Sequence, residues 1–317
     1  MSNVESIGSL SNGSKHVPEV EKRRNVKCPI CLGMRRVALG AYGFLVSVAA
    51  VVAAIFARIT SEKENQLSWM PDKLRRCINY IHATVADVFS ALLLGLFFPI
   101  NLEWLDSKEY DDHGGPPILF IHGFLGSSNN WIYHRYRLQK QGYNNLFTIN
   151  LGHFQSMEQY AERVKKKVEE IKEVCGKKGV VLIGHSMGGL VAEKYKSSLD
   201  LSGNNWVRKI ITIGSPLKGT KLAEIAPKTS RVVKQMTRNS SCLGNLGFGV
   251  SEDEAAKYYH IASDTDNIIH PRSSAKGPES NENIMLNATG HVGYMFSSRV
   301  SDLILKKLNR LRLKDVL

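Results

Sequence analysis

From about residue 117 onward, short apolar runs alternate with longer stretches in which apolar and polar residues recur at helical spacing. The apolar runs are 118–121, 146–149, 180–183 and 210–213, with weaker runs at 258–261 and 283–286. Between the runs, residues 155–175 and 190–199 have helical periodicity. Strands that are apolar on both faces and separated by helices are typical of a parallel sheet covered on both sides. The pattern therefore predicts an α/β fold with a mostly parallel sheet.

A longer apolar stretch precedes this region. Residues 37–57 form a run of 21 residues without a charge, flanked by Arg35 and Arg36 before it and Arg58 after it. This length is enough to cross the hydrocarbon core of a bilayer. A buried core helix is the alternative, but such helices usually have a polar face, and this run has none. We predict a transmembrane helix at 37–57 and a membrane location for the protein.

A second apolar stretch, 88–100, has only 13 residues. Extending it backwards includes Asp87 and His82, which are costly in hydrocarbon. It is interpreted as a re-entrant or interfacial segment, a second span, or packing for the following domain. A single span preceded by basic residues favours a cytoplasmic N-terminus, whereas two spans return the main domain to the cytoplasm. The sequence leaves open which side of the membrane holds the domain.

These patterns predict four segments. Residues 1–36 are polar and basic and are expected to form a disordered tail, and 37–57 the transmembrane helix. Residues 58–112 are expected to be a linker that includes the second apolar stretch, and 113–317 the α/β domain. Within that domain, 222–251 is a candidate lid that contains the basic amphipathic sequence RVVKQMTR.

Lys and Arg outnumber Asp and Glu by 42 to 29, for a formal net charge of +13. This excess favours an anionic partner. The basic residues are scattered and no nucleic-acid-binding motif is visible, so a membrane surface is preferred to a nucleic acid. Cys28 and Cys31 are at most half of a zinc site, and no phosphate-binding glycine motif occurs. We expect no metal and no cofactor.

The apolar run at 180–183 leads directly into Gly184-x-Ser186-x-Gly188. This spacing fits a nucleophile elbow, a sharp strand-to-helix turn that projects a serine hydroxyl. A Cβ at either flanking position would collide with the neighbouring backbone. Ser186 is the candidate nucleophile, and the N–H of Met187, at the start of the next helix, is a candidate oxyanion donor. The alternative is an ordinary glycine-rich turn.

His122-Gly123-Phe124 directly follows the run at 118–121. In a fold with this elbow, the loop after that earlier strand supplies the second oxyanion N–H, which is assigned to Phe124. His122 is expected to hold the loop through its ring nitrogens. The alternative is a tight glycine turn.

A serine nucleophile needs a histidine base and an acid that orients it. The histidines beyond Ser186 are His260, His270 and His291. His291 lies in a glycine-flanked loop after a predicted strand and is the preferred base. Asp264 and Asp266 are both candidate acids, and Asp266 is favoured because Ile268 and Ile269 would anchor its loop.

These motifs resemble the α/β-hydrolase superfamily and, more narrowly, the small bacterial triacylglycerol lipases of the Bacillus lipase A type. The similar sequences are HGFLG, GHSMGG, GSPLKGT, DNII and GHVGYMFSSRVSDLI. The resemblance implies a sheet of about six strands with helices on both faces. It also implies a Ser186–His291–Asp266 triad, with oxyanion donors at Phe124 and Met187.

The expected function is that of a membrane-anchored serine hydrolase that cleaves carboxylic esters, with lipid esters preferred. The alternatives are a phospholipase, thioesterase or acyltransferase on the same fold, or a non-catalytic hydrolase-like membrane protein. The expected partners are a lipid or small ester and a membrane, with no nucleic acid. The sequence does not indicate the acyl-chain length, the headgroup or the oligomeric state.

Overall fold

The computed structural model describes residues 70–97, 100–176, 178–200, 206–227, 230–247 and 257–316. The predicted basic tail (1–36), the predicted transmembrane helix (37–57) and the Cys28–Cys31 pair lie outside these residues.

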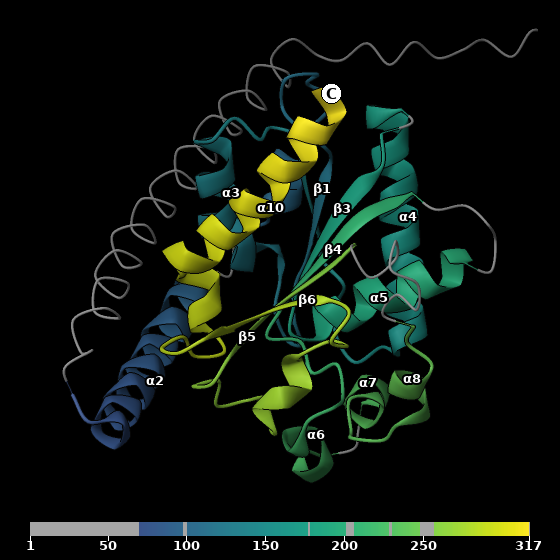
Figure 1. The fold of residues 1–317 in the computed structure, drawn as a ribbon. Helices are drawn as coiled ribbons and strands as arrows, with labels where there is room; N and C mark the ends of the chain where they lie inside the picture. The colour runs from purple at the N-terminus through teal and green to yellow at the C-terminus, as the bar shows by residue number, and fades with distance from the viewer. Residues whose placement is uncertain are drawn as a thin grey trace, which may run out of the picture. The chain divides into compact units, whose positions relative to one another are not determined.

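Six strands form one sheet in the described part of the chain, in the order β2-β1-β3-β4-β5-β6, and all neighbouring strands are parallel (Figure 1). They are β1 (Ile118–Ile121), β2 (Leu146–Ile149), β3 (Val180–His185), β4 (Val207–Ile213), β5 (Tyr258–Ser263) and β6 (Glu282–Leu286). Each contains one of the six predicted runs or nearly all of it. The predicted parallel α/β fold is therefore confirmed.

The strand order reverses between β1 and β3. The chain goes from β1 outward to β2, then crosses back and adds β3 on the other side of β1. In open parallel sheets, ligands bind beyond the carboxyl ends of the strands at such a switch point. The sequences HGF and GHSMGG begin at the ends of β1 and β3, so both of these motifs lie at the switch point.

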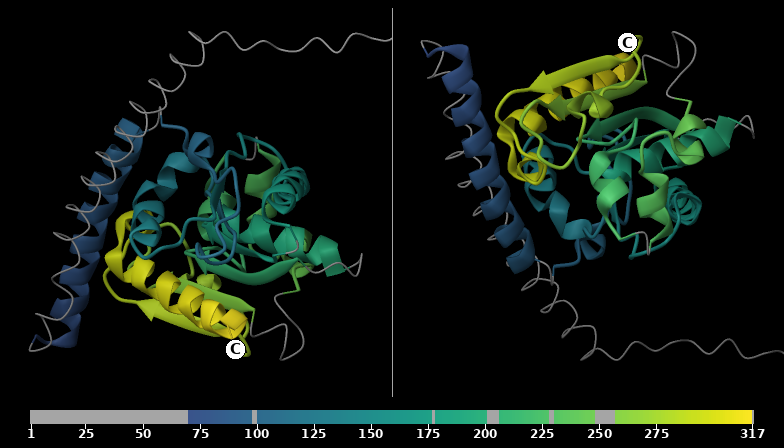
Figure 2. Two further views of the ribbon diagram at one scale, coloured as in Figure 1. Left: turned by 90° about the horizontal axis from the view of Figure 1, so that it is seen from above. Right: turned by 90° about the horizontal axis from the view of Figure 1, so that it is seen from below.

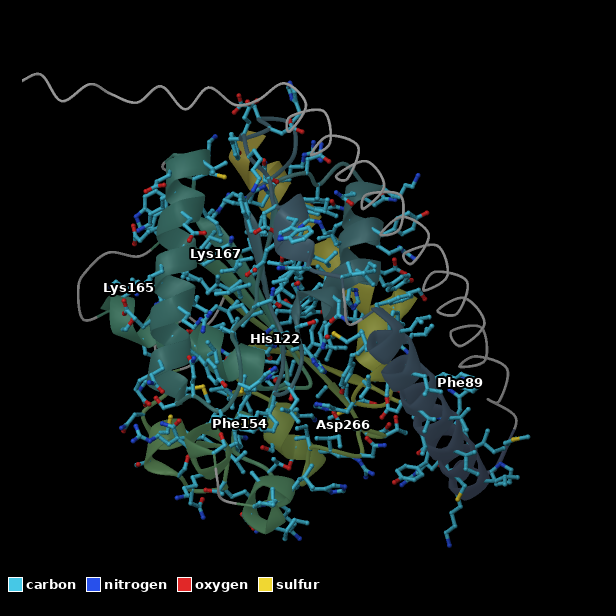
Figure 3. The ribbon with its side chains drawn as sticks, turned by 180° about the vertical axis from the view of Figure 1, so that it is seen from behind. Phe89, His122, Phe154, Lys165, Lys167 and Asp266 are labelled. Carbon is cyan, nitrogen blue, oxygen red and sulfur yellow. The ribbon has the colours of Figure 1, made fainter. Side chains whose placement is uncertain are left out.

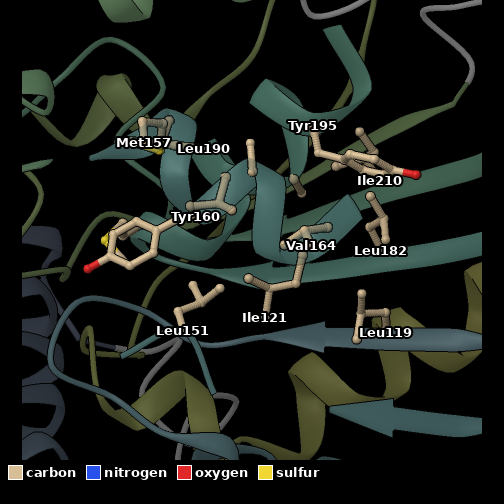
Figure 4. Packing of buried hydrophobic residues seen from close by; sticks show 14 of the residues in the cluster. Leu119, Ile121, Leu151, Met157, Tyr160, Val164, Leu182, Leu190, Tyr195 and Ile210 are labelled. Atoms are coloured by element: carbon tan, nitrogen blue, oxygen red, sulfur yellow. The ribbon is translucent and has the colours of Figure 1, made fainter. Parts of the chain in front are cut away.

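Helices cover both faces of the sheet (Figure 1). They are α3 (Ile132–Gln139), α4 (Met157–Cys175), α5 (Met187–Asp200) and α10 (Ser298–Val316). Helices α4 and α5 pack on one face, where side chains such as Val164 and Leu190 meet Leu119, Ile121 and Leu182 (Figure 4). Helices α3 and α10 contact each other on the opposite face.

Local sequence determines where α4 begins and ends. The Ser156 hydroxyl accepts a hydrogen bond from the N–H of Gln159, while the Gln159 side chain accepts one from the N–H of Ser156. This capping box satisfies two N–H groups that have no partner within the helix. Gly176 ends the helix with a φ of 61°, a backbone conformation that glycine adopts without strain.

The interval predicted as a linker contains a 26-residue helix, α2 (Asp72–Phe97), and a short 3₁₀ helix, η1 (Leu102–Leu105). Helix α2 contacts two further 3₁₀ helices, η2 (Ser128–Trp131) and η4 (Gly293–Phe296). Both views in Figure 2 place it outside the layer of α3 and α10. Among the described helices, α2 is long and apolar enough to cross a membrane, by length and composition alone.

The candidate lid, 222–251, is described over 222–227 and 230–247. With the residues just before it, this region contains three short helices: α6 (Lys221–Ile225), α7 (Arg231–Gln235) and α8 (Ser241–Gly244). The basic amphipathic sequence RVVKQMTR supplies α7, whose Val232 and Val233 are buried. Another 3₁₀ helix, η3 (Arg272–Ala275), follows β5.

Candidate active site

Ser186 occupies the single position between β3 and α5 and has a φ of 53°. This left-handed conformation costs a non-glycine residue about 1–2 kcal/mol, so the surrounding structure must hold it in place. The N–H of Ser186 donates a hydrogen bond of 2.8 Å to the carbonyl of Ile213 on the neighbouring strand β4. Strained, half-buried residues of this kind are characteristic of functional sites.

The glycines around Ser186 are required by close backbone packing. A Cβ at Gly184 would overlap the backbone of Gly188 and Gly189, and a Cβ at Gly188 would overlap the carbonyls of Ile121 and His122. A Cβ at Gly123 would lie 2.9 Å from that of Ser186. The predicted need for both elbow glycines is therefore confirmed, and the same steric argument extends to the HGF loop.

His122 holds the HGF loop through both ring nitrogens. Its Nδ1–H donates to the carbonyl of Gly123 at 2.8 Å, and its Nε2 accepts from the N–H of Leu151 at 2.9 Å. Burial lowers the pKa of His122 to about 4, so the ring is neutral at pH 7, as this donor–acceptor pattern requires. The expected structural role of His122 is confirmed.

Phe124, in the loop held by His122, packs against the core cluster that contains Met187. Met187 is the first residue of α5, so its N–H has no acceptor within that helix. In the described part of the chain, neither the N–H of Phe124 nor that of Met187 donates a hydrogen bond to another protein group. Two N–H groups without protein acceptors, one of them at a helix N-terminus, can bind a developing oxyanion.

Asp266 and His291 lie after β5 and β6 and are joined directly. His291 Nδ1–H donates to Asp266 Oδ2 at 2.9 Å, and the N–H groups of Ile268 and Ile269 each donate to Asp266 Oδ1 at 2.9 Å. Burial alone would raise the pKa of Asp266, but His291 and these two N–H groups hold the pKa below its ordinary value. The carboxylate therefore stays ionised and holds one tautomer of the His291 ring.

Ser186 and His291 line one cavity of about 330 Å³. Its other lining residues include Gly123, Phe124 and Leu125. Among the described residues, no hydrogen bond joins the Ser186 hydroxyl to the His291 ring. Such contacts are often long without a ligand and shorten when substrate binds. The structure thus brings all five predicted site residues to the ends of β1, β3, β5 and β6.

The rival candidates lie elsewhere. His260 is buried in β5, where Thr212 Oγ1 and Asn281 Oδ1 bind its two ring nitrogens at 2.8 and 3.0 Å. Asp264 and His270 are exposed, whereas Asp266 is 1% exposed. Since its carboxylate binds the His291 ring, Asp266 is the acid that the geometry favours. No cluster that could hold a metal ion occurs among the described residues.

One further residue at the site, Asp87 in α2, is not among those predicted from the sequence. Its carboxylate accepts a 2.9 Å hydrogen bond from the N–H of His291 and a 2.7 Å bond from the N–H of Gly293. A Cβ at Gly290 would overlap this carboxylate, which explains the glycines around His291. Burial raises the pKa of Asp87, although these N–H groups and His291 oppose the shift. Helix α2 thus reaches the histidine loop directly.

A second buried side chain, that of His185, also supports the loop of His291. His185, the last residue of β3, donates from Nε2 to the carbonyl of His291 at 3.0 Å, and the two rings are 4.9 Å apart. Burial lowers the pKa of His185 to about 3, so this ring is neutral. Figure 3 labels both His122 and Asp266 in the interior of the domain.

The comparisons with known proteins agree with this architecture. Residues 116–239 match the model of a family described as alpha/beta hydrolase fold. Among solved structures, the mature form of Bacillus licheniformis lipase BlEst2 is 18% identical, with a TM-score of 0.50, covering 64% of this chain and 96% of that one.

Two other similar structures have lower TM-scores. Fungal esterases from Rhizomucor miehei are 13% identical, with a TM-score of 0.46, covering 65% of this chain and 76% of that one. Naproxen esterase from Bacillus subtilis is 15% identical, with a TM-score of 0.40, covering 62% of this chain and 84% of that one.

Proposed function

The chain has the α/β-hydrolase fold, and on that premise we propose that it is a membrane-anchored serine hydrolase that cleaves carboxylic esters of lipids. The observation that carries the proposal is the 2.9 Å bond between His291 and Asp266, in a site where His291 and Ser186 line one cavity. This is the arrangement that general-base activation of a serine requires.

In the proposed mechanism, Ser186 Oγ attacks the ester carbonyl while His291 Nε2 removes its proton. Asp266 holds the Nδ1–H of the ring and stabilises the imidazolium that forms. The N–H groups of Phe124 and Met187 bind the oxyanion. His291 then protonates the leaving alcohol, and water, activated by the same ring, releases the acid from the acyl-enzyme. The ionised state of Asp266 supports this assignment.

Apolar side chains at the cavity support a lipid ester. Leu125 lines the cavity and is 58% exposed, and the exposed ring of Phe154 packs edge-on against Phe124, with centroids 6.3 Å apart. Ala91 and Leu94 of α2 line the same cavity. These surfaces suit an acyl chain better than a polar alcohol or amide. The similar structure BlEst2 is named a lipase, and lipases act on esters of this class.

The anchor is proposed from the uncharged run at 37–57, which is long enough to span a bilayer. It would keep the domain next to its substrate. Phospholipase, thioesterase and acyltransferase activities use the same machinery and differ only in the leaving group or acceptor.

The test uses the full-length protein with p-nitrophenyl esters of short and long acyl chains and a fluorophosphonate probe. Ser186→Ala is expected to abolish labelling and to lower turnover by at least ~10⁴-fold. Ser198→Ala, at an exposed position of α5, is the matched control and should keep full activity. Wild-type protein that is folded but neither labels nor turns over any ester would overturn the proposal in favour of a binding protein.

A further inference from the structure

The large apolar side chains of helix α2 lie on its exposed face, which is unusual for a helix at the surface of a soluble protein. Its large exposed residues are Leu74, Ile81, Val85, Val88, Phe89, Leu92 and Leu96, each at least half exposed. At 3.6 residues per turn these positions fall within an arc of about 100°. We name this arc the outer stripe of α2, and Figure 3 shows Phe89, one of its members, on the side turned away from the strands.

The opposite face of α2 packs against the domain with few large apolar side chains. It consists of small residues and one acid: Ala83, Ala86, Asp87 and Ser90 are buried there, along with Phe97. Helices on the surface of soluble proteins have the reverse distribution, with the apolar face inward. Asp87 is also the only charged residue between Arg76 and Glu103, and it faces inward. The outer stripe is therefore uncharged along its whole length.

We propose that the outer stripe of α2 lies in the surface of a lipid bilayer and contacts its acyl chains, so that the catalytic cavity opens at the membrane. This inference rests on the proposed function for the substrate class. It assigns the stripe to lipid rather than to another protein, on the three observations that follow.

The first observation is continuity with the catalytic cavity. At the C-terminal end of α2, Ala91, Leu94 and Gly95 line the cavity that contains Ser186 and His291. The carbonyl of Leu94 also accepts a hydrogen bond of 3.1 Å from Asn129 Nδ2, in the segment that follows the HGF loop. An acyl chain that leaves the bilayer beside the stripe would thus reach the cavity of the nucleophile along α2.

The second observation is the chain that precedes α2. Only 14 residues, 58–71, separate the uncharged run at 37–57 from the start of the helix. Even fully extended, they reach at most about 50 Å. A span at 37–57 would therefore keep the start of α2 within about 50 Å of the membrane.

The third observation is the position of the charges. Lys73 and Arg76 lie in the first turns of α2, together with Arg75, which pairs with Asp72, before the uncharged part begins. Basic residues at the edge of an apolar helical face bind anionic headgroups while the apolar residues enter the acyl region. Because Asp87, in the middle of α2, binds the His291 loop, these contacts favour a helix that lies along the bilayer surface over one that crosses it.

The test places a fluorescent label on the stripe of the full-length protein in phosphatidylcholine vesicles that contain phosphatidylglycerol. Cys28, Cys31 and Cys77 are replaced by serine, since Cys175 and Cys242 are buried. Single labels are then attached at Val88→Cys or Leu92→Cys. The matched control is Lys166→Cys, an exposed position of α4.

Lipids with a quencher on the acyl chain should quench the stripe labels strongly, and aqueous iodide should quench them weakly. The control label should show the reverse. Stripe labels that respond to iodide as the control does would overturn the proposal. Stripe labels protected from both quenchers would also overturn it, because the stripe would then be covered by protein, such as residues 37–57 or a second copy of the chain.

An activity measurement separates this inference from the proposed function. Val88→Lys combined with Leu92→Lys is expected to lower turnover of a vesicle-embedded ester by about tenfold or more, since charges oppose insertion of the stripe. Turnover of a soluble short-chain ester should not change. If the wild type hydrolyses neither ester, the proposed function fails, while the quenching result still decides where the stripe lies.

Discussion

The elbow around Ser186 and the loop around His291 meet in one cavity, but they are held in different ways. The elbow is supported locally: β3 leads into it, α5 leaves from it, and Gly184 and Gly188 permit its close packing. The His291 loop is held by a carboxylate that lies 204 residues earlier in the chain, on α2. His185 adds support from the elbow itself.

This difference separates two kinds of constraint on a catalytic site. A nucleophile on a strained turn is positioned by backbone sterics, which tolerate almost no change at the glycines. The histidine loop is positioned by hydrogen bonds to side chains from other elements, so its geometry depends on where those elements lie. The elbow should therefore respond to substitutions in an all-or-none way, and the loop in a graded way.

The largest expected effect on the histidine loop comes from Asp266→Asn. The amide cannot stabilise the imidazolium and favours the wrong ring tautomer, so kcat/KM should fall on the order of 10³–10⁴-fold. The substitution leaves the elbow intact. A fluorophosphonate probe should therefore still label Ser186, but more slowly than in the wild type. Steady-state kinetics with a soluble ester measure the loss. A decrease below tenfold would remove Asp266 from the catalytic acid role.

Acid should weaken both regions, because each rests on a buried neutral histidine. Burial lowers the pKa of His185 to about 3 and that of His134, behind the His291 loop, to about 4. The unfolded chain binds protons at these rings below pH 6.5, whereas the folded chain does not, so stability falls as pH falls from 6.5 towards 4.

At pH 5 the loss is about 2 kcal/mol for each such ring. His122 and His260, both with pKa values lowered by burial to about 4, add to it. Urea unfolding followed at pH 7, 6 and 5 measures the change. A free energy of unfolding that is constant over this range would contradict the assignment of these rings as neutral.

Asp87→Asn should have an intermediate effect. The two carboxylate oxygens accept from two separate N–H groups, and an asparagine offers one acceptor and one clashing donor. The His291 loop should shift, and kcat should fall about ten- to hundredfold while KM changes little. Gly290→Ala should lower kcat in the same way, because its added Cβ would overlap the Asp87 carboxylate.

The matched control for this positioning residue is Asp72→Asn, an exposed aspartate of the same helix that pairs with Arg75. It should leave kcat within about twofold of the wild type, as expected for an exposed ion pair. The pH profile of kcat for Asp87→Asn gives a second readout, because a purely structural loss would lower activity without moving the profile. Equal effects of both substitutions would show that Asp87 has no special link to His291.

Asp264→Asn should have the smallest effect. Asp264 is exposed and lies two residues before the buried Asp266, so kcat/KM should stay within about twofold of the wild type. Together with Asp266→Asn, this variant decides between the two acids that the sequence alone left open. A loss comparable to that of Asp266→Asn would reverse the assignment.

Much of the fold could be predicted because its determinants are local. The strands are apolar on both faces, and α4 has a clear amphipathic period with a capping box at Ser156. By contrast, α3 was not identified from its sequence. Its His134 and Arg135 are buried and bonded to other elements, so the polar residues do not mark a solvent face.

The parts of the site that are formed by consecutive residues could likewise be predicted, and the parts that depend on long-range contacts could not. The elbow and the HGF loop are contained in a few consecutive residues, whereas the choice of Asp266 needed the fold to bring β5 and β6 together. The role of Asp87 depends on a contact between residues that are 204 positions apart. From the sequence alone, Asp87 was noted only as a charged residue that is unfavourable in an apolar stretch. A usable signal was present: Ala83, Ala86, Asp87 and Ser90 share one helical face.

The distance along the chain between Asp87 and its loop also has a consequence for synthesis. At ribosomal rates of 5–20 residues per second, roughly 10 to 40 s separate the emergence of α2 from that of His291. Throughout this interval, the inner face of α2 has no histidine loop to bind. The active site is therefore completed only when the loop of His291 returns to a helix that was made 204 residues earlier.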